Sequence, residues 1–309
     1  MPGLLGIECG ATHTVALHEN GGQVVRAGFG PANLRLLDDT QLARHLRQIA
    51  KQFPKPSAVA IGMAGARTPA DKLRLRRAAT RAWPNAAIHA TNDLETALAA
   101  DTQRKPATRV LVLSGTGSCC FGQSPDGATA KIGGWGHILG DKSSGYEIGL
   151  RALKACVFYL DRDGTWSTLG QRLLCRLQLN SPDQLIDWVA QAEKPEVADL
   201  AAEVFAAWAK RDKIAVDILD SAATTLAKDA CACAKKLAGK TAPVRFLLSG
   251  SVLLKQPKFA AKVARAIRAL RPGSQIAALK NESCTGALNL APRWAKPSAT
   301  EIGRAHVRT

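Results

Sequence analysis

Val110-Leu-Val-Leu-Ser-Gly-Thr-Gly-Ser118 is the stretch of sequence that decides the fold of this chain. Its first four residues form an apolar run that leads directly into a turn rich in glycine and hydroxyl groups. A strand ending in such a turn exposes several backbone N–H groups at one point, and these can hold a phosphate without a dedicated cation. A second glycine-rich stretch, Gly133-Gly-Trp-Gly-His137, follows closely and continues to Gly145.

A similar strand and turn begin the chain. The apolar run Leu4–Cys9 leads into Gly10-Ala-Thr-His-Thr14, and a further apolar segment follows. These two turns of the phosphate-binding type lie about a hundred residues apart. The pattern therefore predicts one nucleotide that is held from two sides.

Composition indicates a globular chain of two domains. The length of 309 residues exceeds the usual size of one core, and the hydrophobic fraction of 46% is ordinary. No apolar run approaches the roughly 20 residues that span a bilayer, and no secretory signal is recognisable. We therefore expect a cytoplasmic protein without a membrane partner. The eight scattered cysteines are expected to be reduced, and the Cys231–Cys233 pair faces two sides of a helix and predicts no metal site.

A formal net charge of +17 is compatible with nucleic-acid binding, but the distribution of the basic residues favours a solvated helix face. Basic residues are spread along the chain, and the densest stretch, Lys72–Arg77, has the pattern of the outer face of an amphipathic helix. Aromatic residues make up only 5% of the chain, and none interleaves with this stretch to stack on bases. We expect no nucleic-acid partner, and the positive surface field would attract an anion such as ATP.

Strands and helices alternate in both halves, which predicts α/β layers. Each half begins with a strand pair around a glycine turn, so the halves resemble distant repeats. We expect an N-terminal lobe over residues 1–106 and a C-terminal lobe over 107–300, with residues 196–238 forming alanine-rich helix with few breaks. Residues 301–309 resemble the translation of a sequencing-adapter sequence and are expected to be a non-native tail.

Several motifs together resemble those of the BadF/BadG/BcrA/BcrD-type ATPases, within the superfamily of sugar kinases, actin and Hsp70. The resemblance covers residues 3–291 and is greatest to the N-acetylglucosamine kinases. Its most specific part is Gly-Gly-Trp-Gly-His-Ile-Leu-Gly-Asp at 133–141. Further matches are Gly-Ile-Glu-Cys-Gly-Ala-Thr at 6–12, Gly-Pro-Ala-Asn at 30–33, Asn92-Asp93, Ser-Gly-Thr-Gly-Ser at 114–118 and Ser-Gly-Ser-Val at 249–252.

The resemblance implies two actin-like, ribonuclease H-like α/β domains with a nucleotide cleft between them. It also implies ATP-dependent phosphorylation of an amino sugar, foremost N-acetylglucosamine at its 6-hydroxyl. Asp93 is then the candidate catalytic base for that hydroxyl, since phosphoryl transfer needs one group to take the proton. The alternative for Asn92 or Asp93 is a helix cap.

Glu8 is the candidate ligand of Mg²⁺, held through water, because this ion keeps several waters and takes few carboxylates. The alternative is a carboxylate that is merely satisfied by neighbouring N–H groups. The resemblance implies that ATP is bound by Gly10, Ala11, Thr12, His13, Gly115, Thr116, Gly117 and Gly250. Relatives have a further glycine at the first turn and Gly-Gly-Val in place of Ser249–Val252, which leaves the adenosine contact open.

The resemblance further implies that the sugar is bound by Asn33, Ser118, Trp135 and Asp141. For Trp135 the alternative is ordinary core packing. Lys142 and Ser143 stand where relatives often have Glu and Gly, so the identity of the sugar is less constrained than the reaction.

Three alternatives remain open at this point. One is a glucosamine kinase, which the sequence does not distinguish from an N-acetylglucosamine kinase. Another is an ATPase that activates a reductase or dehydratase, although the cysteines lack the glycine-rich context of a bridging iron–sulfur cluster. The third is a sugar sensor without catalysis. The sequence is also compatible with a homodimer.

Overall fold

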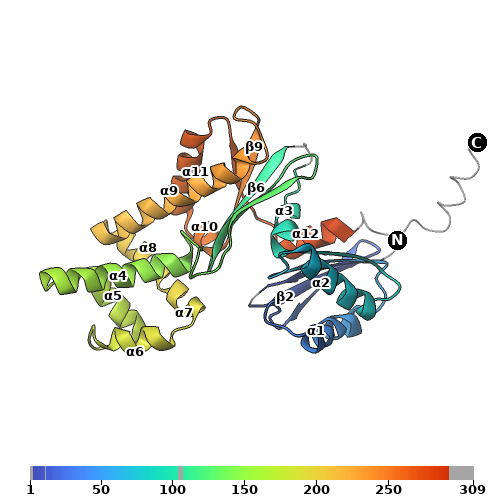
Figure 1. Cartoon of the computed structure of the whole chain (residues 1–309), viewed down its shortest axis with the longest axis horizontal. Helices are drawn as coiled ribbons and strands as arrows, with labels where there is room; N and C mark the ends of the chain where they lie inside the picture. Colours follow the sequence, from blue (N-terminus) through green and yellow to red (C-terminus); the bar gives the residue numbers. More distant parts are fainter. Residues whose placement is uncertain (1–2, 11, 104–106, 292–309) are drawn as a thin grey trace, which may run out of the picture. The chain divides into compact units, whose positions relative to one another are not determined.

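The computed structural model describes residues 3–10, 12–103 and 107–291, so Ala11 and the tail 301–309 lie outside the described residues. The described chain divides into two compact units (Figure 1). The first unit contains residues 3–103 and 279–291, and the second contains residues 107–278. Each unit is built on one five-stranded sheet, which confirms the α/β class.

The sheet of the first unit has the strand order β3-β2-β1-β4-β5. β2 is antiparallel to both of its neighbours, whereas β1, β4 and β5 run parallel. The tight turn at Asn20-Gly-Gly joins β2 to β3, as the sequence predicts. The strands are β1 (Leu4–Cys9), β2 (Thr14–Asn20), β3 (Gln23–Phe29), β4 (Ala58–Met63) and β5 (Ala87–Thr91).

Large and small side chains alternate along the central strands of this sheet. Leu5 and Ile7 of β1 face a core shared with α1 (Asp39–Gln52) and α2 (Pro69–Ala82). On the other face, α12 (Ser283–Leu290) contacts α3 (Asp93–Ala99) and β1. Gly6 of β1 permits this packing, because a Cβ there would collide with the backbone of Leu288. Helices thus cover both faces, as parallel strands require.

The sheet of the second unit repeats this topology, with the order β10-β9-β6-β7-β8. β6 is antiparallel to β7 and parallel to β9, as β1 is to β2 and β4. The repeat suggested by the two glycine turns is therefore present in the fold. The strands are β6 (Thr108–Ser114), β7 (Ser118–Gln123), β8 (Thr129–Gly133), β9 (Val244–Ser249) and β10 (Gln275–Ala278).

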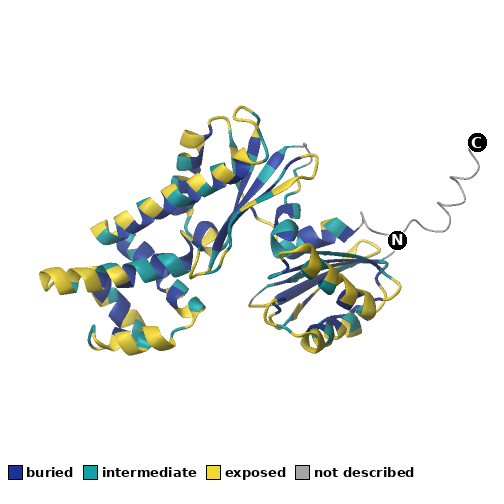
Figure 2. Ribbon diagram, viewed as in Figure 1, coloured by how far each residue is buried: buried dark blue, intermediate teal, exposed yellow. Residues whose placement is uncertain are grey.

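Helices of the second unit pack on one face of its sheet around a large buried core, in which Phe246 and Phe259 are fully buried (Figure 2). α9 lies along β6, β7 and β8, and α4 and α11 pack against α9. The helices are α4 (Gly145–Asp163), α5 (Thr168–Leu177), α6 (Gln184–Gln191), α7 (Lys194–Asp199), α8 (Ala201–Ala209), α9 (Lys213–Lys235), α10 (Ser251–Lys255) and α11 (Pro257–Leu270).

Three features differ from the sequence expectations. The stretch 196–238 is divided among three helices, and Arg211 adopts a left-handed backbone at the second break. β8 was not expected from the sequence, because a short strand beside a glycine turn has little periodicity. α12 belongs to the first unit, not to a continuous lobe 107–300, because its Gly286 docks on α3 and its Leu288 docks on Gly6 of β1.

The basic stretch Lys72–Arg77 lies on α2, where its cations meet carboxylates. Lys72 pairs with Glu95 at 2.6 Å, and Arg74 pairs with Asp39 at 2.7 Å. No helix among the described residues is both long and apolar enough to cross a membrane.

Candidate functional site

In the first unit, the predicted catalytic and metal-binding carboxylates gather at one edge of the sheet. Glu8 lies near the end of β1, and its register partner on β4 is Gly62, which in turn pairs with Thr91 of β5. Asp93 follows β5 after one intervening residue. The carboxyl ends of parallel strands meet at one edge, where α/β folds bind ligands, so Glu8 and Asp93 converge there.

The environment of Glu8 disfavours a negative charge. Burial, and after it the negative charges of Asp93 and Glu282, together raise the pKa of Glu8 from 4.5 to about 7. A carboxylate near others in a half-buried position favours a bound cation, which would relieve the repulsion. The residues present therefore fit the oxygen donors and few carboxylates that Mg²⁺ prefers.

The helix-cap alternative is now assigned to Asn92. The Asn92 side chain accepts a hydrogen bond from the backbone N–H of Glu95 at 2.8 Å and caps α3. Asp93 is the first residue of that helix, and its backbone carbonyl accepts from the Thr96 hydroxyl at 2.9 Å. The Asp93 carboxyl group is thus not the N-cap of α3, which leaves the role of catalytic base as its proposed function.

β1 and β2 form an antiparallel hairpin, and Gly10, Thr12 and His13 lie in the turn between them. Gly10 donates to the carbonyl of His13 at 2.9 Å, and the side chains of Thr12 and His13 lie 3.0 Å apart and are exposed. The carbonyl of Gly10 accepts from Ala32, which ties the 30–33 segment to this turn. Asn33 lies beside Ala64 just after β4, and its side-chain oxygen accepts from the backbone of Arg35 at 3.0 Å.

In the second unit, the turn between β6 and β7 holds Gly115, Thr116 and Gly117. Gly115 donates to the carbonyl of Gly117 at 2.9 Å, and Thr116 at the tip is exposed. The carbonyl of Gly115 accepts from Gly145 at the start of α4, at 2.8 Å. The turn is therefore held rigidly against a helix terminus while its tip faces solvent.

Gly250, the predicted adenosine-site residue, lies against the same turn. It has a φ of 90°, and a Cβ there would collide with the carbonyl oxygen of Ser114. A side chain is thus excluded by backbone conformation and by space together. The structure brings Gly115 and Gly250, which lie far apart in sequence, next to each other.

Three of the four predicted sugar-binding residues line one hollow of about 200 Å³ in the second unit: Ser118, Trp135 and Asp141. Trp135 is 67% exposed, which excludes the core-packing alternative. Asn33, the fourth, belongs to the first unit.

Asp141 is the most constrained of these residues. Its side chain is 5% exposed, and its φ of 56° is left-handed. One carboxylate oxygen accepts from the backbone N–H of Ser118 at 3.2 Å, and the other lies 2.6 Å from the ammonium of Lys194. The Ser118 hydroxyl donates to the carbonyl of Lys142 at 2.6 Å, so the hollow and the turn at 115–117 share hydrogen bonds.

Sequence reasoning missed two charged residues at these places. Lys194 lies in a break between predicted helices, and Glu282 precedes α12 far from the glycine motifs. Neither has a local sequence signal, since each reaches its carboxylate neighbours only through the packing of a helix.

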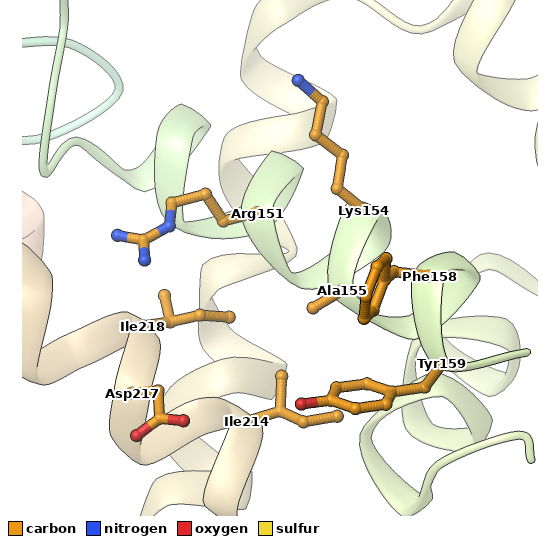
Figure 3. Close-up of a pocket in the computed structure, with 8 residues that line it drawn as sticks. All are labelled: Arg151, Lys154, Ala155, Phe158, Tyr159, Ile214, Asp217 and Ile218. Carbon is orange, nitrogen blue, oxygen red and sulfur yellow. The ribbon is translucent and has the colours of Figure 1, made fainter. Parts of the chain in front are cut away.

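A larger hollow of about 420 Å³ lies between α4 and α9 of the second unit (Figure 3). Lys154 and Phe158 line it from α4, and Asp217 faces it from α9. None of the predicted site residues lines it.

Comparison with known proteins connects this arrangement with a family of ATPases. The sequence profile of the BadF/BadG/BcrA/BcrD ATPase family matches residues 5–287. An N-acetylmuramic acid/N-acetylglucosamine kinase of Clostridium acetobutylicum is 30% identical over 272 residues, covering 85% of this chain and 88% of that protein. An N-acetyl-D-glucosamine kinase of Dictyostelium discoideum is 36% identical over 42% of this chain and 41% of that protein.

Solved structures share the fold at lower identity. A candidate N-acetylglucosamine kinase from Chromobacterium violaceum superimposes with a TM-score of 0.68 at 23% identity, covering 94% of this chain and 99% of the other. A ROK family glucokinase from Streptomyces griseus, solved with glucose and AMPPNP, gives a TM-score of 0.58 at 14% identity, covering 94% and 99%. These likenesses establish the two-domain, actin-like fold of sugar kinases.

Proposed function

We propose, from the premise that the chain belongs to the BadF/BadG/BcrA/BcrD ATPase family, that it is an ATP-dependent amino sugar kinase. The similarity to a kinase of N-acetylated amino sugars, over 85% of this chain, supports this reaction class. We assign N-acetylglucosamine as the first substrate and its 6-hydroxyl as the acceptor. Because the reaction consumes ATP, we assign it to the cytoplasm.

One observation carries the proposal: the glycine turn at 115–117 lies against Gly250, and the next residue, Ser118, donates to Asp141 in the hollow that Trp135 also lines. A phosphate-binding turn and a polar hollow with an exposed aromatic side chain suit a nucleotide and a sugar ring that react with each other. The proposed ligands of ATP are Gly115, Thr116, Gly117 and Gly250, with Gly10, Thr12 and His13 of the first unit.

In the proposed reaction, the oxygen of the sugar hydroxyl forms a bond to the γ-phosphorus of ATP, and Asp93 accepts the proton of that hydroxyl. The bond from that phosphorus to the bridging oxygen breaks, and the electron pair leaves on ADP. Backbone N–H groups of the glycine turns orient the phosphates and stabilise the developing charge. Water exclusion during the transfer favours the sugar over hydrolysis.

Glu8 would hold Mg²⁺, through water, at the edge of the first sheet. When bound, the ion supplies charge neutralisation to the phosphates. The raised pKa of Glu8 supports this assignment, because a cation beside Glu8 would offset the repulsion from Asp93 and Glu282.

The test is a panel of sugars with ATP, read out as ADP release. N-acetylglucosamine should be phosphorylated at the highest kcat/KM. A higher kcat/KM for glucosamine or for N-acetylmuramic acid would assign the protein to that substrate class instead. Absence of turnover with every amino sugar would overturn the proposed function.

The assignment of Asp93 is tested by Asp93→Asn, with Asp39→Asn as the matched control. Asp39 is the first residue of α1 as Asp93 is of α3, so both changes remove one acid from a first helical turn. We expect Asp93→Asn to lower kcat by about 100-fold or more with ATP affinity retained, and Asp39→Asn to remain active. Full activity of Asp93→Asn would contradict its role as the base.

A further inference from the structure

Lys194 contacts Asp141, which lines the proposed sugar-binding hollow, from outside the sequence motifs of that hollow. Its ammonium lies 2.6 Å from one carboxylate oxygen of Asp141, and its side chain is 29% exposed. Among the described residues, Asp141 is its one ion-pair partner. The other carboxylate oxygen accepts from the backbone N–H of Ser118. Asp141 is therefore held from both sides, by the glycine turn and by α7.

The position of Lys194 is set by the packing of α7 on the start of α4. A Cβ on Gly149 would collide with the backbone carbonyl of Val197, and a Cβ on Gly145 would lie 3.1 Å from that of Ala198. Two glycines at i and i+4 form a smooth strip on one face of α4, and α7 lies directly on it. The close docking brings the first residue of α7 to Asp141.

Asp141 needs a compensating charge where it stands. A buried carboxylate without a partner is costly, and a left-handed aspartate persists only when its surroundings hold it. The segment from Asp141 to Ser143 is held by the hydroxyls of Ser114 and Ser118, which donate to the carbonyls of Ser143 and Lys142. Those bonds fix the backbone, whereas Lys194 compensates the charge of the side chain.

We infer that Lys194 is a positioning residue of the sugar site, acting through Asp141. This inference rests on the proposed function, in which Asp141 accepts hydrogen bonds from sugar hydroxyls. Each carboxylate oxygen can accept more than one hydrogen bond. Lys194 and Ser118 occupy one site on each oxygen, which fixes the plane of the carboxylate and leaves the remaining sites for the sugar.

The experiment compares Lys194→Met and Lys194→Arg with Lys262→Met. Lys262 of α11 forms a surface ion pair with Asp220 at 2.5 Å and has a similar side-chain exposure of 31%, so its loss matches the removal of one ion pair. KM is measured for the sugar and for ATP separately, together with kcat, sugar Kd by calorimetry and the melting temperature.

We expect Lys194→Met to raise the sugar KM and Kd by about tenfold or more, with the KM for ATP within about twofold of wild type. Lys194→Arg keeps the positive charge and should restore most of the sugar affinity. Lys262→Met should leave both KM values unchanged. The double variant with Lys194→Met and Asp141→Asn should lose less free energy of sugar binding than the two single variants lose together, because the two residues act as a unit.

Three outcomes would overturn the inference: an unchanged sugar KM in Lys194→Met, an equal rise in both KM values, or a lower sugar KM. The second would indicate a purely structural role, and the third an ion pair that competes with the sugar. If the wild-type protein phosphorylates no amino sugar, the proposed function fails and this inference fails with it. An active wild type with an unaffected Lys194→Met variant overturns the inference alone.

Discussion

At the scale of single residues, the most informative group is Glu8, whose environment opposes its own charge. Its pKa of about 7 reflects burial first and the charges of Asp93 and Glu282 second. The ionised form of such a carboxylate destabilises the folded state, and a bound cation would stabilise it. Arg26 pairs with Glu282 at 3.4 Å, and both of these side chains are exposed.

This shift predicts how stability depends on pH. Between pH 4.5 and about 7 the folded state retains a proton on Glu8 that the unfolded state loses, so the free energy of unfolding falls as pH rises through that window. The Glu8→Gln variant lacks this titration. We expect it to lose less stability than wild type from pH 5 to 7.5, by on the order of 2 kcal/mol, in denaturant titrations at both pH values without Mg²⁺. Parallel pH profiles for the two proteins would contradict the raised pKa.

At the scale of elements, the two sheets use the same strand order to present a turn at equivalent places. β1 and β2 flank Gly10, Thr12 and His13, and β6 and β7 flank residues 115–117. In the second unit, the parallel neighbour β9 ends at Ser249, and the next residue, Gly250, lies beside that turn. The close approach of two backbones requires a residue without a side chain.

Gly250→Ala tests this requirement, with Gly127→Ala as the control. Both glycines have a φ of 90°, but a Cβ at Gly127 meets nothing within 4 Å, whereas one at Gly250 meets the backbone of Ser114. Alanine at either position should lower the free energy of unfolding by about 1–3 kcal/mol, because a side chain is strained at a left-handed backbone φ. Only Gly250→Ala should also weaken ATP binding, by about tenfold or more, as measured by calorimetry. Equal ATP affinity in the two variants would contradict a role for this contact.

How far the sequence predicted the site depends on which element carries each residue. Glu8 and Asp93 could be placed together, because parallel strands bring their carboxyl ends to one edge. Trp135 and Asp141 came from a specific motif. Lys194 could not be found, because its position depends on how α7 packs on Gly149, and that contact joins segments whose periodicity shows only that both are helical.

At the scale of the whole molecule, the chain leaves the first unit and later returns to it. α12 packs on β1 and α3, and Asn281 and Asn289 donate to the carbonyls of Ala100 and Ala99 at 2.9 and 3.1 Å. A buried cluster joins Val15 and Leu17 of β2 to Leu288. The first unit is therefore completed by residues near the C-terminus, which a division at residue 106 would separate from it.

Truncation tests the contribution of α12. A chain ending at Ala278 should lose the cooperative unfolding of the first unit and all kinase activity, because one face of its sheet is uncovered. A chain ending at Thr300, which lacks the expected non-native tail, should match the full chain in melting temperature and kcat. Retained activity after the first truncation would show that α12 is dispensable.

The return of α12 also constrains the order in which a nascent chain acquires its structure. When residues 3–103 have left the ribosome, the helix that covers Gly6 has not been synthesised. The second unit is continuous in sequence, so all of its residues leave the ribosome before α12 does. We therefore expect the later half of the protein to reach its native packing first during translation, with the earlier half needing protection from aggregation until synthesis ends.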